Sequence, residues 1–428
     1  MQKVRRLFAK VAGRGGKWEQ GSRKRRTEVL TRTGHARLTA TPLAYIVQSR
    51  FPVLHERHRR KAGLLAAFMS TATLYSVSAT AQSSVTLYGL VDMGVRYTTH
   101  ADPQGDSKVQ MVSGASESHF GFQGVEDVGG GTKVLVDLES RFFPNSGVTD
   151  PAYPFFNTAF VGVRSDSYGK LTMGRQINPL ADAVLSAFVT NPWLPTFYQF
   201  RPEVTMAQGV WTSNMAKYAA RWQDVTAEVS YAFGGNAGAF GAGSQIGASI
   251  LYLPGAPLRL AAAYLDSRDA VNGSAHFKSW TAGGSYTFDS TTFMAGWAVN
   301  RQDAGFEGNF PNGPFSAPEL TALKINTFSS REMFYGGVSQ QLGDAIHLSG
   351  NVWRTLQTGK TPAADGNATQ FQLVADYNWS KRTDTYLEAD YSLYRGGLVG
   401  AQLQGINALS SAYGTTQLGI MAGLRHTF

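Results

Sequence analysis

The chain ends on "GIMAGLRHTF", residues 419–428, and one parity of this stretch is almost wholly apolar. Ile420, Ala422, Leu424 and Phe428 share that parity, with His426 as its one polar member. Successive side chains of a β-strand point to opposite faces, so the pattern predicts a final strand with one face against an apolar medium. A frayed, solvated terminus would show no such alternation. What that apolar medium is decides the function.

The same period of two recurs along the chain. In "TKVLVDLESRF", residues 132–142, Val134, Val136 and Leu138 alternate with charged side chains. Sixteen segments of this kind lie between residues 84 and 428, and many reach the ten residues that a tilted strand needs to cross a bilayer. Short turns such as "SKRTD" alternate with long loops rich in Gly, Pro, Asn and Ser. This organisation is typical of an up-and-down antiparallel barrel.

Composition excludes several classes of protein. The chain has no cysteine, which excludes disulfides and thiolate metal sites. Its net charge of +9 is unevenly placed, because residues 1–81 hold 17 Lys and Arg against 3 acidic residues. Subtracting these from the totals of 39 and 30 leaves 22 basic and 27 acidic residues for the remainder. The body is therefore mildly acidic, and we expect no nucleic-acid partner.

Residues 53–81 have the organisation of a secretory signal peptide. A basic cluster at 57–61 precedes an apolar stretch, and Ala79-Thr80-Ala81 forms an A-x-A cleavage site. A transmembrane anchor is the alternative, which the short, Ser- and Thr-interrupted apolar stretch disfavours. Residues 1–52 are basic and patternless, and we interpret them as an upstream extension that is not native or as an extended leader. Residues 82–428 form the predicted barrel domain.

The apolar face of the strands has two possible directions. A soluble sandwich also alternates, with its apolar face inward, but the long strands and the aromatic residues at their ends favour an outer-membrane barrel. In hydrocarbon every backbone N–H and C=O must be paired within the protein. The sheet must then close, and we expect "LRHTF", residues 424–428, to lie beside "SVTLYG", residues 84–89.

Four longer motifs carry a resemblance to a known family. They are "SSVTLYGLVDMGV" (83–95), "HFGFQGVEDVGGGTKVLVDLE" (119–139), "FVGVRSDSYGKLTMGRQ" (160–176) and "DYNWSKRTDTYLEADYSLY" (376–394). With the terminal strand, they resemble the general porins of Gram-negative outer membranes. The resemblance implies an all-β, sixteen-stranded homotrimeric channel that passes small hydrophilic solutes and ions without a cofactor. It also implies contact with outer-membrane lipid and lipopolysaccharide, and makes Phe428 an assembly signal for the barrel-assembly machinery.

In that family the third long loop folds into the lumen, and its acidic residues face a ladder of basic residues on the wall. The equivalent loop here is 178–210, and its charged residues are Asp182, Arg201 and Glu203. Wall positions that are often basic hold other residues, namely Leu90, His119, Asn157 and Trp211. The aromatic residues expected on the loop are Trp193, Phe197, Tyr198 and Phe200. They either pack the loop against the wall or select solutes, and the sequence leaves both open.

The polar parities of the strands supply the other candidate residues. The candidates for the pore lining and constriction are Asp92, Arg96, His119, Lys133, Asp137, Glu139, Arg141, Asn157, Asp182, Arg201, Glu203 and Lys217. Arg175 shares the outward parity of Leu171, so we expect a subunit interface to cover it, with Asp150 of a neighbouring subunit as its partner.

Three other functions remain as alternatives. A substrate-selective channel of the same fold is the first, a barrel enzyme or adhesin the second, and a soluble lectin a distant third. Asp137 and Glu139, like Glu388 and Asp390, have the spacing of paired carboxylates on one strand face. The histidines are scattered, and no nucleophile or metal-protease motif accompanies these pairs. We therefore expect the carboxylates to solvate the lumen, and we expect no catalytic or metal site.

Overall fold

The structure is a computed structural model that describes residues 83–428, except for 151–153, 194–199, 256, 272, 307–311, 314–316 and 404–412. The expected leader segments 1–52 and 53–81 lie outside the described residues, and so do Phe197 and Tyr198. Within the described ranges, no helix has both the length and the hydropathy of a membrane span.

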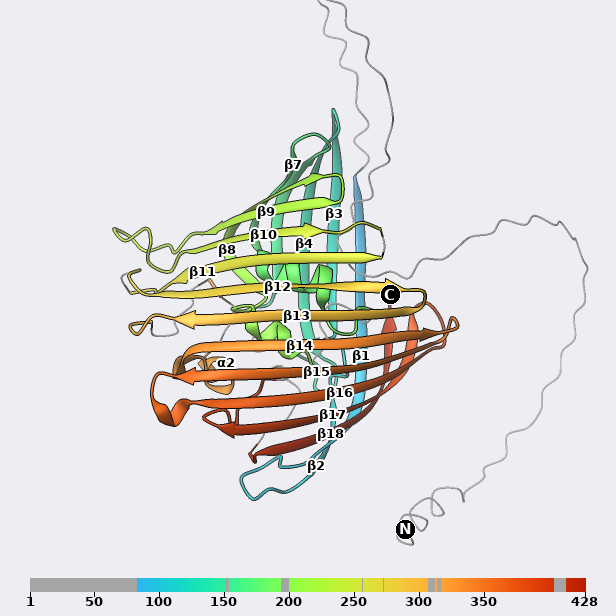
Figure 1. Ribbon diagram of the computed structural model, residues 1–428. Coiled ribbons are helices and arrows are strands. Elements are labelled where there is room, and N and C mark those ends of the chain that lie inside the picture. The colour runs from blue at the N-terminus through green and yellow to red at the C-terminus, as the bar shows by residue number, and fades with distance from the viewer. Residues whose placement is uncertain are drawn as a thin grey trace, which may run out of the picture. The chain divides into compact units, whose positions relative to one another are not determined.

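Strands joined in antiparallel register make up a single closed sheet, shown in Figure 1. Their bounds are β1 Ser84–Thr98, β2 Lys108–Val112, β3 His119–Gly129, β4 Thr132–Phe143, β5 Val148–Thr149, β6 Thr158–Ser165, β7 Gly169–Ile177, β8 Trp211–Trp222, β9 Val225–Ala232, β10 Gln245–Tyr252, β11 Leu258–Arg268, β12 His276–Phe288, β13 Thr291–Gln302, β14 Phe328–Leu342, β15 Ile346–Gly359, β16 Gly366–Asn378, β17 Thr383–Gly396 and β18 Thr416–Thr427. Both β2 and β3 pair with β1, and both β5 and β6 pair with β4. Each of these pairs is one interrupted strand, so the predicted sixteen-stranded barrel is confirmed.

The helical elements lie in the connections between strands. They are α1 Pro179–Ala183, η2 Val184–Phe188, η3 Pro202–Met206, α2 Ala317–Ala322, η4 Ile325–Thr327 and η5 Pro362–Ala364. The first three belong to the connection between β7 and β8, which is the predicted constriction loop.

The barrel closes where the first strand meets the last (Figure 1). Residues Leu90 to Thr98 of β1 pair with β18, and Gly89 and Phe428 exchange two backbone hydrogen bonds of 3.3 and 3.0 Å. The predicted closure is confirmed, but the predicted register is wrong. Residues 84–88 pair with β3 alone, because the chain ends before β18 can reach them. Strand tilt in a barrel requires such a stagger.

The two faces of the sheet are inverted relative to a soluble protein. On β16, Phe371 and Leu373 are 44% and 65% exposed, whereas Gln370 and Gln372 are at most 1% exposed. The exposed apolar side chains form the outer surface, and the polar side chains fill the interior. The barrel therefore presents its apolar face to lipid and its polar face to the lumen, as the terminal strand predicts.

Substituting Gly89 by Leu is expected to block the closing seam. A Cβ atom at this position would lie 2.5 Å from the carbonyl oxygen of His119 and 2.6 Å from the ring of Phe428. Because a backbone oxygen cannot move aside cheaply, we expect at least a several-fold loss of folded barrel. The measurement is the heat-modifiable band on unheated gels after refolding in detergent. Gly124→Leu is the control, since its Cβ would meet Val136 at an ordinary 3.6 Å.

Candidate pore constriction

The side chain of Asn178 links the two ends of the connection that runs from residue 178 to residue 210. The Oδ1 atom of Asn178 accepts a hydrogen bond from the N–H of Ala181 at 2.9 Å and caps α1. Its Nδ2 atom donates to the carbonyls of Ala207 and Gly209, at the far end of the same connection. Pro179 follows as the first helical residue, where a missing N–H costs nothing. "NP" therefore starts the helix and holds both ends of the loop together.

The first half of the loop lies inside the barrel, against the strands β10 to β14. Ser285 donates to the carbonyl of Ala187 at 2.6 Å, and the ring of Phe188 stacks on Tyr335 with centroids 6.2 Å apart. Gly283 and Gly296 leave the space for Phe188, because a Cβ atom at either position would lie 2.6 or 2.7 Å from its ring. These two glycines on the wall thus fix the position of the loop.

The second half of the loop is anchored further around the wall. Glu203 accepts hydrogen bonds from the indole of Trp353 at 2.7 Å and from the hydroxyl of Thr190 at 2.6 Å. Arg201 donates to the carbonyl of Asn191 at 3.0 Å. Glu203 is 0% exposed and Arg201 is 2% exposed. Neither of these two pore-lining candidates faces the aqueous lumen, because Glu203 binds the loop to the wall and Arg201 binds one part of the loop to another.

Two of the four loop aromatics also pack against the wall. Phe200 is buried, with its ring 5.7 Å from that of Trp353. Trp193 stacks on His347 with centroids 4.9 Å apart. Of the two interpretations that the sequence left open, packing describes both of these side chains.

A hydrogen-bonded cluster lies on the wall formed by β1, β3 and β4. The hydroxyl of Tyr88 lies 3.0 Å from Asp137 and 3.2 Å from Glu139. Gln123 donates to Asp137 at 3.1 Å, and Asn157 donates to Glu139 at 2.8 Å. The sequence signal for Tyr88 was its parity, which it shares with Asp92 and Arg96 in β1, and Gln123 shares the inward parity of His119. Neither residue is among the candidates that charge and motif indicate.

Arg141 joins this cluster to the start of β8. Its guanidinium pairs with Glu117, lies 3.9 Å from Glu139, and stands 4.1 Å above the ring of Trp211. His119 lies beside the same group, with Nε2 4.0 Å from Glu139. Trp211 therefore occupies a position that is often basic in the family and supports a cation from another strand instead.

One ion pair joins the loop to the pore wall. Lys217 of β8 donates to the carboxylate of Asp182 in α1 and, at 2.8 Å, to the carbonyl of Ile177. Burial raises the pKa of Asp182 to about 6, while the charge of Lys217 lowers it and that of Glu228 raises it further. The resemblance implies acidic residues on the loop that face basic residues on the wall. This ion pair has that arrangement, with one acidic residue on the loop and one basic residue on the wall.

The remaining candidates bind other residues of the barrel wall and of its connections. Asp92 accepts from the N–H of Ser116 and from the hydroxyl of Tyr386, both at 2.7 Å, and it fastens the segment between β2 and β3. Arg96 pairs with Asp390 at 2.6 Å. Asp92 and Arg96 are almost wholly buried in the structure, so neither faces open lumen. Lys133, by contrast, lies 3.7 Å from Asp127 near a turn, and its side chain is one-third exposed.

Arg175 keeps the outward parity of Leu171 and Met173, since Thr172 and Gln176 hydrogen-bond to each other on the inner face. The register of β7 shifts between Gly174, whose φ is +136°, and Gln176. Arg175 donates to Ser213 at 2.8 Å, and the residue is 8% exposed within one chain. Asp150 is 3% exposed. The subunit interface expected at Arg175 and Asp150 stays a prediction.

Metal chemistry has no support in the described part of the chain. Within those ranges, no group of three or more His, Asp and Glu side chains is placed to hold a metal ion.

Comparisons with known proteins agree with the barrel and its inner loop. The family model of Gram-negative porins matches residues 65–397. Outer membrane porin protein 32 of Delftia acidovorans is 28% identical over 365 residues, covering 82% of this chain and 96% of that protein. In fold, the chain is similar to the anion-selective porin from Comamonas acidovorans, with a TM-score of 0.64, 24% identity, and coverage of 81% and 100%. It is also similar to the trimer form of OmpT of Vibrio cholerae, with a TM-score of 0.59, 14% identity, and coverage of 81% and 99%. The chain belongs to the Gram-negative porin family, and its barrel is a passive diffusion channel of the outer membrane.

Proposed function

We propose that this channel passes small hydrophilic solutes with only a weak preference for cations or anions near neutral pH. The observation that carries the proposal is the pairing of charges at the constriction. Lys217 is matched by Asp182, and Arg141 by Glu117 and Glu139. Paired charges produce a smaller net field across a pore than a ladder of one sign does. The similar porin from Comamonas acidovorans is named as anion-selective, but Asp137 and Glu139 supply negative charge to this wall.

The reversal potential of the pore in a salt gradient measures this property. For a tenfold gradient of KCl across a planar bilayer, we expect less than half of the roughly 59 mV of a perfectly selective pore. A value near that limit would contradict weak selectivity but would leave the channel function intact. Current recordings without channel openings would instead favour the barrel enzyme or adhesin. We propose neither function, because the charged side chains in the lumen are paired with one another.

We also infer that the chain acts as a homotrimer, that residues 53–81 are removed on export, and that the barrel-assembly machinery recognises Phe428. The support is the family resemblance and the place of Phe428, whose ring packs over Gly89 at the seam. Gel mobility before and after heating reports the trimer. Arg175 and Asp150 are the proposed contact between subunits, so Arg175→Ala is expected to weaken the trimer on unheated gels.

A further inference from the structure

A bulge of the barrel wall lies opposite the middle of β1. Between Leu90 and Gly94, β1 has three residues. The partners of these two residues are His119 and Val112, and six residues, 113–118, lie between them. The surplus residues leave the ladder at the break between β2 and β3. We call the segment 113–118 the inner bulge, because it contacts side chains on the inner face of the barrel. Bulges bend a strand and redirect its side chains.

The start of the inner bulge is held by three strands. Asp92 of β1 accepts a hydrogen bond from the N–H of Ser116. Tyr386 of β17 accepts one from the N–H of Ala115 at 2.7 Å. Arg425 of β18 donates to the hydroxyl of Ser116 at 3.0 Å. All three side chains are buried on the inner face. The bulge therefore extends from β1 across β18 to β17 on the lumen side of the wall.

Gly114 allows the bulge to approach the wall this closely. Its φ is +43°, and a Cβ atom at this position would overlap the carboxylate of Asp92 and lie 2.7 Å from the hydroxyl of Tyr386. A residue without a side chain fits both the conformation and the space. The bulge is thus packed against the wall as tightly as a protein interior.

The other end of the bulge reaches the point where the constriction loop returns to the wall. Glu117 pairs with Arg141, whose guanidinium lies over the ring of Trp211. Trp211 directly follows Val210, the last residue of that loop. The bulge and the loop therefore meet on this side of the passage.

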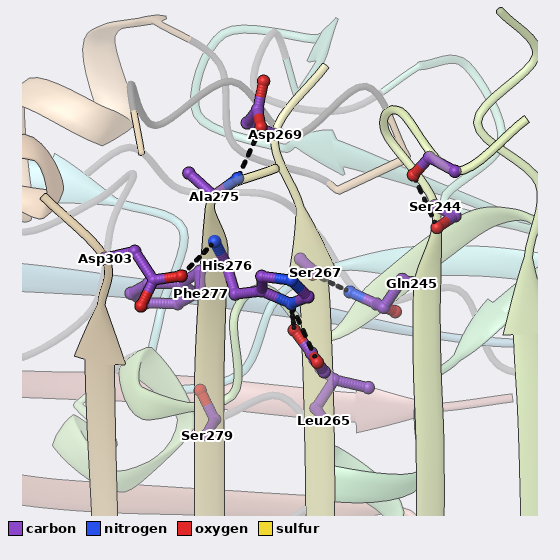
Figure 2. A network of polar contacts seen from close by, with 12 residues as sticks. Ser244, Gln245, Leu265, Ser267, Asp269, Ala275, His276, Phe277, Ser279 and Asp303 are labelled. Carbon is purple, nitrogen blue, oxygen red and sulfur yellow. Dashed lines mark hydrogen bonds and ion pairs between the residues drawn. The ribbon is translucent and has the colours of Figure 1, made fainter. Parts of the chain in front are cut away.

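The hydrogen bonds of the constriction loop extend along the wall from β11 to β16. Gln208 accepts a hydrogen bond from Ser267 of β11 at 2.6 Å. Ser267 also accepts one from Gln245 of β10, drawn as a dashed line in Figure 2. Further around the wall, Asn191 of the loop donates to Gln372 of β16 at 2.9 Å. The next strand is β17, where the bulge is held.

The loop and the bulge also adjoin at this second side. Trp193 of the loop stacks on His347 of β15, which is opposite Asp376 of β16. Asp376 is in turn opposite Tyr386, the residue that holds the bulge. His347 and Tyr386 are therefore two strands, or about 10 Å, apart.

We propose that the inner bulge is the second half of the pore constriction and limits the size of the solutes that pass. The bulge and the loop 178–210 adjoin near Trp211 and near Tyr386, so together they form a ring around the passage. Ala115 of the bulge and Phe188 of the loop belong to one buried apolar cluster, which fixes the two elements relative to each other. The proposal concerns the size of solutes and does not depend on the weak ion preference proposed above.

Deleting residues 114–116 tests the proposal. Residues 113, 117 and 118 then face the three residues of β1, so β2 and β3 keep their present registers as one regular strand. Glu117 stays, so the net charge is unchanged. We expect the single-channel conductance to rise about 1.5-fold, and larger sugars to enter liposomes, because the ring is wider. A trimer of this variant that folds and keeps the wild-type size limit would overturn the proposal.

A second measurement does not require the deletion variant to fold. The chain has no cysteine, so Glu117→Cys places a single thiol on the bulge. Reaction with a small, uncharged methanethiosulfonate adds bulk there, and we expect it to lower the conductance by about one third. Val91→Cys is the matched control, because Val91 lies opposite the bulge but points outward from the barrel. Its reaction should leave the conductance unchanged.

Equal changes at residues 117 and 91 after complete reaction would show that the bulge does not border the narrow passage. Both measurements are compared with wild type in the same symmetric salt, and the sugars are neutral. A failure of the proposed ion preference, which reversal potentials report, therefore leaves this test unaffected.

Discussion

Replacing Gly296 by Leu is expected to about double the single-channel conductance, because the constriction loop would leave the wall. A Cβ atom at Gly296 would lie 2.7 Å from the ring of Phe188 and 2.3 Å from that of Tyr335. A packed interior cannot absorb such an overlap. The loop is held at this point by Phe188 and by the hydrogen bond from Ser285 to Ala187. Displacing Phe188 therefore frees the first half of the loop.

Single-channel recording and liposome swelling with sugars of increasing size provide the measurement. Swelling should extend to larger sugars in the variant. The control is Gly124→Leu, which makes the same change in a strand without approaching the loop. An unchanged conductance in a properly folded Gly296→Leu barrel would show that the loop does not define the narrowest part of the pore.

Lowering the pH through about 6 is expected to make the channel clearly anion-selective. Asp182 has a pKa raised to about 6 by burial, so it takes up a proton there and leaves the ammonium of Lys217 without its ion-pair partner, attracted only by the more distant Glu228. We expect the ratio of chloride to potassium permeability to rise about threefold, because an unmatched cation in a narrow passage attracts anions strongly. Reversal potentials measured across a pH series give this ratio directly.

Asp182→Asn should show the anion preference already at neutral pH, and its selectivity should no longer change near pH 6. Lys217→Gln is the companion variant, and it should remove the rise. A titration that persists unchanged in Asp182→Asn would assign the effect to another group. Protonation of Asp182 has opposite effects on the ion pair and on the fold: it breaks the pair with Lys217 but stabilises the folded state. Since the folded state raises the pKa of Asp182, its burial costs stability above about pH 6, and that cost disappears as the pH falls toward 3.8.

The barrel could be predicted from sequence because its signal is repeated in most of the strands, although the segments 154–165, 211–222 and 329–342 alternate poorly. Residues such as Leu373 and Gln372 alternate with a period set by backbone geometry alone, and closure follows from the need to pair every backbone group in lipid. The exact seam was not predictable in the same way. The register between β1 and β18 depends on the strand tilt and on the position of Phe428. The alternation of "SVTLYG" is the same whether or not β18 lies beside it.

The constriction was harder to predict, because its partners are far apart in sequence. Its charge makes Glu203 a candidate for the pore lining. In the structure its carboxylate accepts a hydrogen bond from Trp353, 150 positions along the chain. Arg175 has the outward parity of Leu171, yet it donates to Ser213 and is 8% exposed in one chain, which parity does not show. Lys217 and Asp182 were both among the candidates, but only the fold brings them into contact. Parity assigns a face of the sheet, whereas it cannot show which groups meet across the lumen.

The seam between Gly89 and Phe428 has a consequence for biogenesis. The contact that completes the wall joins the first strand to the last residue, so it has almost the greatest sequence separation that the barrel allows. Until the ribosome has released the whole polypeptide, both edge strands keep unsatisfied backbone groups and invite pairing with other chains. Contacts of such high separation also form slowly. We therefore expect the precursor to stay open at its edges, and prone to pairing with other chains, until insertion lets its two ends meet.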